Sequence, residues 1–413
     1  MKNYINRFAD TVLKNRLRGS GAVLIQGAKG CGKTETALRA AKSSVRLDVD
    51  EDVRMRMELD PRSVLKGPVP RLIDEWQERP DLWNHVRREV DDRKKKGQFI
   101  LTGSANPEER ARLHSGAGRF SIIKMRPMSL FERGWSTGEV SLFSVMKGAG
   151  PKSETVDFNL ETLAEKITLG GWPSLLYSGG REALRFMRDY TALIAEVDIS
   201  RVSGKKRDPL KVMRLLQSLS RNISTEASLS SLARDTGGSN DETIAEYLDV
   251  LERLMIVEQL PAWSTHIRSA DTLRKAPKRH FVDPSFAIGA LGLSMDKLLG
   301  DLKFFGFLFE SLAIRDLRIY ADLYDGKVFH YRDSRNMEID AVVEYPDNTW
   351  AAFEVKMSFN SQDEAAKNLL AFAEKINQEK AGKPAALTVI TANGFACRRK
   401  DGVNVIPLSV LTA

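Results

Sequence analysis

Residues 27–34 carry the clearest chemical signal in the sequence. They read Gly-Ala-Lys-Gly-Cys-Gly-Lys-Thr and fit G-x-x-x-x-G-K-[ST], between an apolar segment and a helical one. In this pattern backbone N–H groups surround a phosphate, Lys33 reaches the β and γ phosphates, and Thr34 ligates Mg²⁺. The alternative is a glycine turn that caps a helix. We predict ATP and Mg²⁺ as cofactors, bound by Gly27, Ala28, Lys29, Gly30, Cys31, Gly32, Lys33 and Thr34.

Two acids at the end of the apolar segment 70–75 extend this prediction. Asp74 can hold Mg²⁺, and Glu75 can orient and deprotonate the attacking water. Acids close many strands, but a phosphate loop upstream favours the functional interpretation. Thr102 or Ser104, after another apolar run, is expected to sense the γ-phosphate, with a helix cap as the alternative.

A second group of charged residues lies near the C-terminus. Asp340 is followed fourteen positions later by Glu354-Val355-Lys356, with a predicted turn at residues 346–348. The period of two places Glu354 and Lys356 on one strand face. Asp340 and Glu354 could share a divalent metal, with Lys356 polarising water and Glu310 completing the cluster. A cross-strand ion pair is the alternative, although carboxylates within apolar runs favour a site.

These motifs together carry a family resemblance. GAKGCGKT, LIDEWQ, ILTGS and GAGRF resemble AAA_14-like AAA+ ATPases with a C-terminal DUF4143-type domain. The later segments LGGWPSLL, FVDPSFAIGALG and FGFLFESLAIRDL extend the resemblance over most of the chain. Cys31 departs from the small or hydroxyl residue that is commoner in the loop, and its backbone can still serve.

The resemblance implies more about the site. The C-terminal part resembles restriction-endonuclease-like nucleases, whose D…ExK pattern matches Asp340, Glu354 and Lys356. The arginine of the GAGR segment, Arg119, would be an arginine finger acting on a neighbouring subunit's γ-phosphate. This leaves a homo-oligomer open, and a solvated loop arginine is the alternative.

The elements around the motifs predict an α/β fold. A parallel sheet with crossover helices is expected from the apolar runs at 21–27, 44–49, 70–75, 98–103 and 120–125. The helix before the fourth run is expected to stop at Gly97. Residues 210–260 resemble a winged helix, and a second α/β region follows residue 300. We therefore predict an AAA+ P-loop domain at 1–135, a helical and winged-helix-like connector at 136–295 and a PD-(D/E)xK nuclease-like domain at 296–413.

Length and composition agree with this organisation. The 413 residues suit two to three domains at roughly 150 residues each. Hydrophobic residues make up 42% and charged residues 29%, which excludes a disordered or fibrous chain. Two cysteines and five scattered histidines argue against a disulfide framework and a structural metal. We expect a cytoplasmic protein with no membrane partner, because the sequence has neither a membrane-span-length apolar stretch nor a secretory signal.

The positive charge is concentrated in two segments. The net charge is +8, while residues 201–221 alone carry +6 and residues 266–280 carry +4. Both flank the winged-helix-like stretch, so we predict contacts with duplex DNA phosphates without base readout, with a solvated surface as the alternative. The expected function is an ATP-hydrolysing protein that couples nucleotide state to DNA binding, with metal-dependent cleavage left open. The alternative is a nucleotide-dependent switch or scaffold whose nuclease-like domain is a non-catalytic interaction module.

Overall fold

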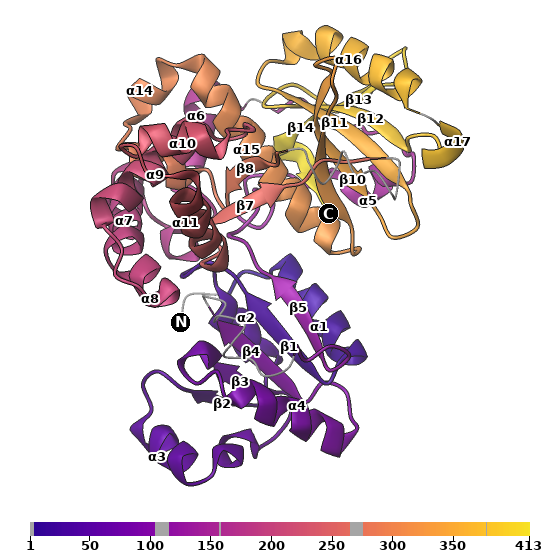
Figure 1. The fold of residues 1–413 in the computed structure, drawn as a ribbon. Coiled ribbons are helices and arrows are strands. Elements are labelled where there is room, and N and C mark those ends of the chain that lie inside the picture. The colour runs from indigo at the N-terminus through magenta and orange to yellow at the C-terminus, as the bar shows by residue number, and fades with distance from the viewer. Residues whose placement is uncertain (1–3, 104–114, 157, 265–275, 377) are drawn as a thin grey trace. The chain divides into compact units, whose positions relative to one another are not determined.

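A computed structural model gives the fold of the chain (Figure 1). It describes residues 4–103, 115–156, 158–264, 276–376 and 378–413. The chain divides into two compact units. The first consists of Met1–Pro127, Asp198–Lys206 and Asp249–Ile256, and the second of Met128–Val197, Arg207–Leu248 and Val257–Ala413. The first segment of the first unit ends at Pro127, near the predicted domain boundary at residue 135. Most of the predicted connector, 136–295, and of the predicted nuclease-like domain, 296–413, lies together in the second unit.

The first unit is built on a five-stranded parallel sheet in the order β2-β3-β4-β1-β5. Its strands are β1 (Ala22–Gln26), β2 (Ser43–Arg46), β3 (Arg71–Asp74), β4 (Phe99–Gly103) and β5 (Phe120–Lys124). All five predicted strands are present, and β4 lies beside β1. The connections are long because parallel neighbours need a crossover. The predicted α/β fold with a parallel sheet is thus confirmed for this unit.

Helices cover both faces of this sheet. They are α1 (Phe8–Gly19), α2 (Lys33–Ala40), α3 (Glu51–Leu59) and α4 (Leu82–Arg93), and α8 (Ile199–Ser203) belongs to the same unit. Successive residues of a strand point to opposite faces. Leu24 of β1 therefore packs in a core with Trp83 of α4, and Val23 packs in another core with Ala37 of α2.

The end of α4 differs from the prediction. The helix ends at Arg93, and Lys94 follows as a left-handed C-cap with a φ of 50°. Gly97, the predicted stop, lies in the turn into β4, where its N–H donates to the carbonyl oxygen of Ser20 at 2.8 Å. The prediction was wrong because residues 94–96 are polar and offer no apolar side chain to continue the buried face of α4.

The second unit is mainly helical before residue 323. Its elements here are β6 (Val140–Ser141), α5 (Leu142–Met146), α6 (Leu160–Leu169), α7 (Gly180–Leu193), α9 (Pro209–Arg221), α10 (Leu229–Asp235), β7 (Val257–Leu260), β8 (Lys278–Phe281), α13 (Ser285–Leu291), α14 (Met295–Leu299) and α15 (Leu302–Asp322). α11 spans Asp241–Arg253. β7 and β8 pair antiparallel. No helix in the described ranges has the length and apolar character needed to cross a bilayer.

A six-stranded mixed sheet completes the second unit, in the order β13-β14-β12-β11-β10-β9. The elements are β9 (Lys327–Arg332), β10 (Glu338–Glu344), β11 (Trp350–Lys356), α16 (Gln362–Lys375), α17 (Gln378–Ala381), β12 (Ala386–Thr391), β13 (Cys397–Arg398), β14 (Asn404–Pro407) and β15 (Leu411–Thr412). β9, β10 and β11 form an antiparallel meander, and α16 crosses over to β12, which is parallel to β11. Leu369 and Phe372 of α16 pack against the sheet.

Candidate functional site

The phosphate loop joins β1 to α2, and its geometry requires its glycines. Gly30 and Gly32 have φ angles of 74° and 103°, which side chains rarely tolerate. A Cβ on Gly27 would lie 2.2 Å from the carbonyl oxygen of Met125, so no larger residue fits there. α2 begins at Lys33, directly after the loop, so its N-terminal N–H groups and positive dipole end are available to an anion. The strand, loop and helix are arranged as the motif predicts.

Lys33 lies folded over the loop. Its Nζ donates hydrogen bonds to the carbonyl oxygens of Gly27 and Ala28, both at 3.0 Å. Only 5% of the residue is exposed. Both partners are neutral backbone groups, so a phosphate oxygen would offer this ammonium a stronger, charge-assisted acceptor.

Two other loop side chains, those of Lys29 and Cys31, lie in different surroundings. Lys29 is half-exposed and forms an ion pair with Asp198, which belongs to the same unit. Cys31 is fully buried, and its Sγ lies 3.5 Å from the carbonyl oxygen of Met125. The unusual cysteine therefore fills the core beneath the loop and leaves the backbone N–H groups in place.

Asp74 connects the loop to the neighbouring strands. Its Oδ1 accepts hydrogen bonds from Thr34 Oγ1, at 3.0 Å, and from Thr102 Oγ1. These side chains meet because β1, β3 and β4 are parallel and their C-terminal ends share one edge of the sheet. Asp74 is only 4% exposed, and together with Thr34 it supplies the oxygen ligands that Mg²⁺ prefers. Thr102 thus lies at the site, while Ser104 lies outside the described residues.

Glu75 follows β3 directly and has an unusual backbone. Its φ of 54° lies in the left-handed region, which costs free energy in a non-glycine residue. Such conformations cluster at functional sites, where the surrounding structure maintains them. The Oε2 of Glu75 accepts a hydrogen bond from Gln77 Nε2, which orients the carboxylate.

Arg119 lies at the N-terminal ends of the strands of this sheet, whereas the phosphate loop lies at their C-terminal ends. It precedes β5, and its carbonyl oxygen accepts a hydrogen bond from Ala22 at the start of β1, whereas the phosphate loop follows the end of β1. The Arg119 guanidinium holds Asp91, with Nε 2.9 Å from Oδ1, and this hydrogen bond lowers the pKa of the Asp91 carboxyl. Arg119 therefore lies outside the nucleotide site of its own chain. Its action on a neighbouring subunit stays a prediction.

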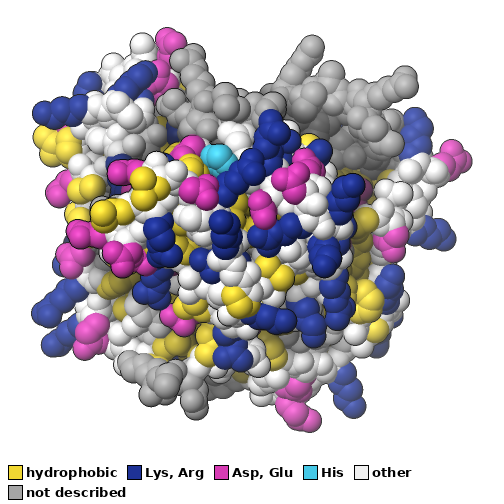
Figure 2. Space-filling model, turned by 90° about the horizontal axis from the view of Figure 1, so that it is seen from below, with side chains coloured by type: hydrophobic (Ala, Val, Ile, Leu, Met, Phe, Trp, Pro, Cys, Tyr) yellow, Lys and Arg dark blue, Asp and Glu magenta, His cyan; other side chains and the backbone are white. Residues whose placement is uncertain are grey.

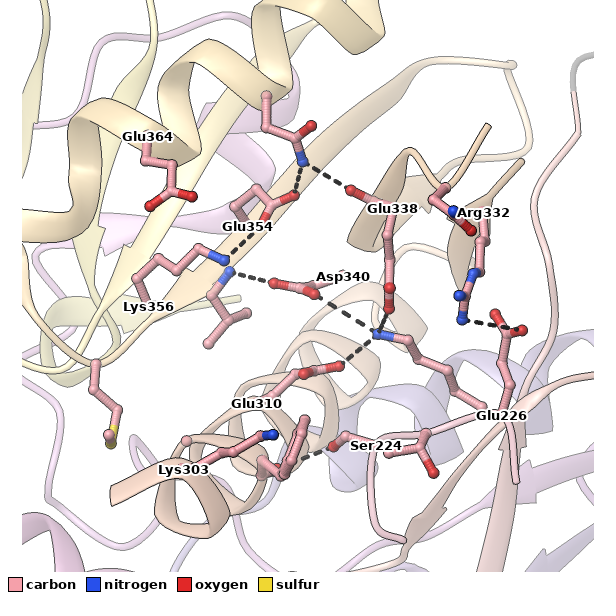
Figure 3. Close-up of a pocket in the computed structure, with 18 residues that line it drawn as sticks. Ser224, Glu226, Lys303, Glu310, Arg332, Glu338, Asp340, Glu354, Lys356 and Glu364 are labelled. Carbon is pink, nitrogen blue, oxygen red and sulfur yellow. Dashed lines mark hydrogen bonds and ion pairs between the residues drawn. The ribbon is translucent and has the colours of Figure 1, made fainter. Parts of the chain in front are cut away.

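A pocket of about 730 Å³ in the second unit contains the C-terminal residues predicted from the sequence (Figure 3). Asp340 lies in an irregularity of β10, where the pairing with β9 shifts between Ile339 and Val342. Such a bulge redirects the side chains of the extra residue. The Val355 N–H donates to Asp340 Oδ2 at 2.8 Å, which links the two strands of the hairpin.

Glu354 and Lys356 of β11 lie in the same pocket. Lys356 Nζ is 3.2 Å from Glu354 Oε2, and Asn368 Nδ2 of α16 donates to Glu354 Oε1 at 2.7 Å. Burial, reinforced by the charge of Asp340, raises the pKa of Glu354 well above its ordinary value. Burial and the charge of Asp340 also raise the pKa of Glu310, on α15, to about 8. The predicted four residues are thus brought together by a hairpin and a helix.

Two charged residues of this pocket, Lys278 and Glu338, were not among the predicted site residues. Lys278 of β8 has its Nζ 2.9 Å from Glu310 Oε1, 2.7 Å from Glu338 Oε1 and 3.7 Å from Asp340 Oδ1. Glu338 could have been found, because it precedes Asp340 by two positions on the same strand. Lys278 gave no such signal, since it lies in the basic segment 266–280, for which we predicted contacts with duplex DNA phosphates.

With Lys278 in its present position, the carboxylates around it do not fit a divalent metal. The Lys278 ammonium lies 3.7 Å from Asp340, one of the two predicted ligands, and also contacts Glu310 and Glu338. Lys356 contacts Glu354, the other predicted ligand. Within the described ranges no three His, Cys, Asp or Glu side chains are grouped so that they could hold a metal. The assignment of Asp340 and Glu354 as metal ligands therefore stays a prediction.

The basic segments are only partly at the surface. On α9, Lys211, Arg214 and Arg221 are exposed and lie on one side of the helix, opposite the buried Leu216. In the second segment, Lys278 is buried, and Arg279 donates to the carbonyl oxygen of Ala227. Arg268, Arg274 and Lys275 lie outside the described residues. Lys and Arg also cover much of the face seen in Figure 2, with Asp and Glu between them, as on an ordinary solvated surface.

Family models match three parts of the chain. Residues 19–133 match an AAA domain, residues 160–297 match a domain of unknown function (DUF8612), and residues 305–411 match a domain of unknown function (DUF4143). The first part is thus an AAA-like ATPase domain that binds nucleotide, and the chain carries a DUF4143 domain at its C-terminal end. To this extent the family resemblance seen in the sequence is confirmed.

Individual similar proteins give little information on the function of this chain. An uncharacterized protein of Mycobacterium tuberculosis and one of Mycobacterium bovis are each 25% identical over 357 residues, which cover 85% of this chain and 73% of theirs. A crystal structure of a DNA replication initiation factor has 14% identity and a TM-score of 0.21, and covers 58% of this chain and 84% of that one. A signal transduction ATPase with a tetratricopeptide repeat sensor from Pyrococcus horikoshii has 13% identity and a TM-score of 0.24, and covers 78% of this chain and 48% of that one.

Proposed function

Because residues 19–133 are an AAA-like ATPase domain, we propose that this chain hydrolyses ATP with Mg²⁺ and uses its nucleotide state to control duplex DNA binding. The observation that carries the proposal is the convergence of Thr34, Thr102 and Asp74 beside the phosphate loop. In this proposal the C-terminal domain is a nuclease-like module that does not cut.

The nucleotide site has a residue for each part of phosphoryl transfer. The loop N–H groups and Lys33 bind the phosphates, and Thr34 and Asp74 would hold Mg²⁺, which neutralises charge on the phosphate oxygens. Thr102 contacts the same aspartate and is placed to respond to the terminal phosphate. Glu75, which follows the Mg²⁺ ligand, positions the attacking water and accepts its proton.

Steady-state phosphate release tests the ATPase part. Lys33→Ala removes the phosphate-binding ammonium, and Glu75→Gln keeps the shape of the side chain but removes the base. Both variants should lose ATP turnover, while Glu75→Gln still binds ATP. Glu58→Gln is a matched control, because Glu58 is an exposed carboxylate on α3 of the same unit. Unchanged turnover in both Lys33→Ala and Glu75→Gln would refute the ATPase proposal.

The exposed side of α9 supports the DNA part of the proposal. Lys211, Arg214 and Arg221 are at spacings of three and seven, so one helix presents three cations in a row toward solvent. A helix with this pattern, in a region of three helices followed by two paired strands, fits phosphate contacts along a duplex. The proposal rests on these three side chains and no longer on Lys278 or Arg279, which point into the protein.

Metal-dependent DNA cleavage is a second candidate function. It is favoured by the hairpin that brings Asp340, Glu354 and Lys356 into one pocket, as the resemblance to restriction-endonuclease-like enzymes implies. The buried Lys278 favours the non-cutting alternative. The two candidates differ in what they predict for supercoiled DNA with Mg²⁺ or Mn²⁺.

One experiment compares them. Fluorescence anisotropy of a labelled duplex should show nucleotide-dependent affinity, with Glu75→Gln plus ATP differing from Lys33→Ala by several-fold. In parallel, supercoiled plasmid should stay intact with Mg²⁺ or Mn²⁺. Nicking that disappears in Asp340→Ala would establish the nuclease candidate. Equal duplex affinity in both nucleotide states would contradict the switch.

A further inference from the structure

Lys278 is a buried cation that no predicted motif includes. It begins β8, reaches the pocket from outside the hairpin that carries Asp340 and Glu354, and its side chain is only 3% exposed. Glu310, Glu338 and Asp340 point toward one another, and the dashed lines from these carboxylates converge (Figure 3). Three acids from two elements therefore share one ammonium group.

The charge on Lys278 is maintained by these acids. Burial lowers its pKa, but Glu310, Asp340 and Glu338 outweigh burial and raise the pKa above its ordinary value. A charged group this deeply buried is tolerated only when it is paired. The geometry therefore shows an ion cluster in which one buried ammonium occupies the space between three carboxylates.

A divalent ion bound by the same oxygens would have to replace this ammonium. The Nζ lies within hydrogen-bond distance of Glu310 and Glu338, so an ion between these carboxylates would meet a like charge at close range. Moving Lys278 out of the cluster would leave a buried charge without a partner, which is strongly destabilising.

The remaining oxygens of the predicted metal pair already accept hydrogen bonds. Asp340 Oδ2 accepts from the backbone of Val355, and the two oxygens of Glu354 face Asn368 and Lys356. Those donors hold the carboxylates in their present orientation.

We propose that Lys278 is the built-in cation of the C-terminal pocket, which therefore takes no divalent metal. We further infer that removing Lys278 lets Glu310, Glu338 and Asp340 move together into a divalent-cation site, which they do not form in their present positions. The inference concerns the second unit and does not depend on ATP hydrolysis or DNA binding.

Counting bound Mn²⁺ tests this inference. The full chain, free of nucleotide, is titrated with Mn²⁺, and free Mn²⁺ is measured by electron paramagnetic resonance. The wild type and Asp340→Asn should bind the same number of Mn²⁺ ions per chain. Lys278→Met should bind one more Mn²⁺ per chain than the wild type, and adding Asp340→Asn should abolish that additional binding. Mn²⁺ should also raise the unfolding midpoint of Lys278→Met more than that of the wild type.

Two further variants separate the effect of the charge at residue 278 from the effect of losing any lysine of the pocket. Lys278→Arg keeps the cation and should gain no Mn²⁺, and Lys303→Met removes an exposed lysine of the same pocket and should behave like the wild type. An Asp340-dependent Mn²⁺ in the wild type would overturn the inference, as would a folded Lys278→Met that binds none. If circular dichroism shows that Lys278→Met is unfolded, the comparison of wild type with Asp340→Asn decides alone.

Discussion

The nucleotide site and the C-terminal pocket use the same residue types and differ in what those residues contact. In the nucleotide site, Lys33 contacts backbone carbonyl oxygens, and Asp74 contacts the hydroxyls of Thr34 and Thr102. In the pocket, Lys278 contacts three carboxylates directly. The acid and the lysine of the first site are each bound to neutral groups, and those of the second are bound to one another.

This difference teaches how to distinguish a site for a charged ligand from an ion cluster. Neutral hydrogen bonds to Lys33 and Asp74 can be exchanged for phosphate and Mg²⁺, because the new partners carry opposite charge. The carboxylates around Lys278 already have an opposite charge at contact distance. A motif of acids and a lysine therefore does not by itself predict metal chemistry.

Among substitutions outside the phosphate loop, Arg119→Ala is expected to give the largest effect. If the nucleotide site is completed by a neighbouring copy, loss of this arginine should lower ATP turnover by about 10³-fold, the range of an arginine finger. Turnover per chain of the wild type should then rise with protein concentration. Arg87→Ala is the control, because Arg87 lies on α4 beside the same Asp91. Turnover that is the same in Arg119→Ala and the wild type would show that Asp91 is its only functional partner.

Glu75→Gln comes next. Removing a general base should lower turnover by about 10²-fold or more, while the affinity for ATP stays within a few-fold of the wild type. Single-turnover phosphate release and nucleotide binding by fluorescence measure the two separately. A loss of binding as large as the loss of turnover would mean that Glu75 supports the fold of the loop and not the chemistry.

The two lysines should differ in their effect on stability. Lys278→Met leaves a group of buried carboxylates without a cation and should cost about 3–5 kcal/mol of unfolding free energy. Lys33→Met removes hydrogen bonds to two carbonyls and should cost roughly 1–2 kcal/mol, while it abolishes ATP turnover. Urea denaturation of both variants gives the comparison. Equal losses of stability would contradict the distinction between the two sites.

The basic side of α9 should give the smallest effect. Each of Lys211→Ala, Arg214→Ala and Arg221→Ala should weaken duplex binding a few-fold and lower the salt slope by about 1. Lys383→Ala and Lys400→Ala, two exposed lysines of the C-terminal sheet region, are the controls. An unchanged salt dependence in the triple variant would locate DNA binding elsewhere.

Short sequence patterns correctly predicted those features that depend on neighbouring residues in the chain. The five strands of the first unit follow from their apolar runs, and the loop follows from a motif whose spacing is fixed by its backbone. The meeting of Asp340 and Glu354 could be predicted because one short turn joins their strands. The contact of Thr102 with Asp74 could not be predicted with certainty, because it requires β4 to lie beside β3 in the sheet.

The rest depended on contacts between distant segments. Lys278 is basic and lies among other basic residues, so its segment was predicted to contact duplex DNA phosphates, with a solvated surface as the alternative. Only the packing of β8 against α15 and β10 brings its ammonium to Glu310 and Asp340. The end of α4 was predicted at Gly97 and lies at Arg93. The residues between them have good helix propensity, but they add no apolar side chain to the buried face of the helix.

The most direct test of the contrast between the two sites is the number of Mn²⁺ ions bound by the wild-type chain with and without a non-hydrolysable ATP analogue. We predict one additional Mn²⁺ per chain with the analogue, which is lost in Asp74→Asn and retained in Asp340→Asn. We also predict no Asp340-dependent Mn²⁺ in either condition. An Mn²⁺ that binds without nucleotide and disappears in Asp340→Asn would contradict the account.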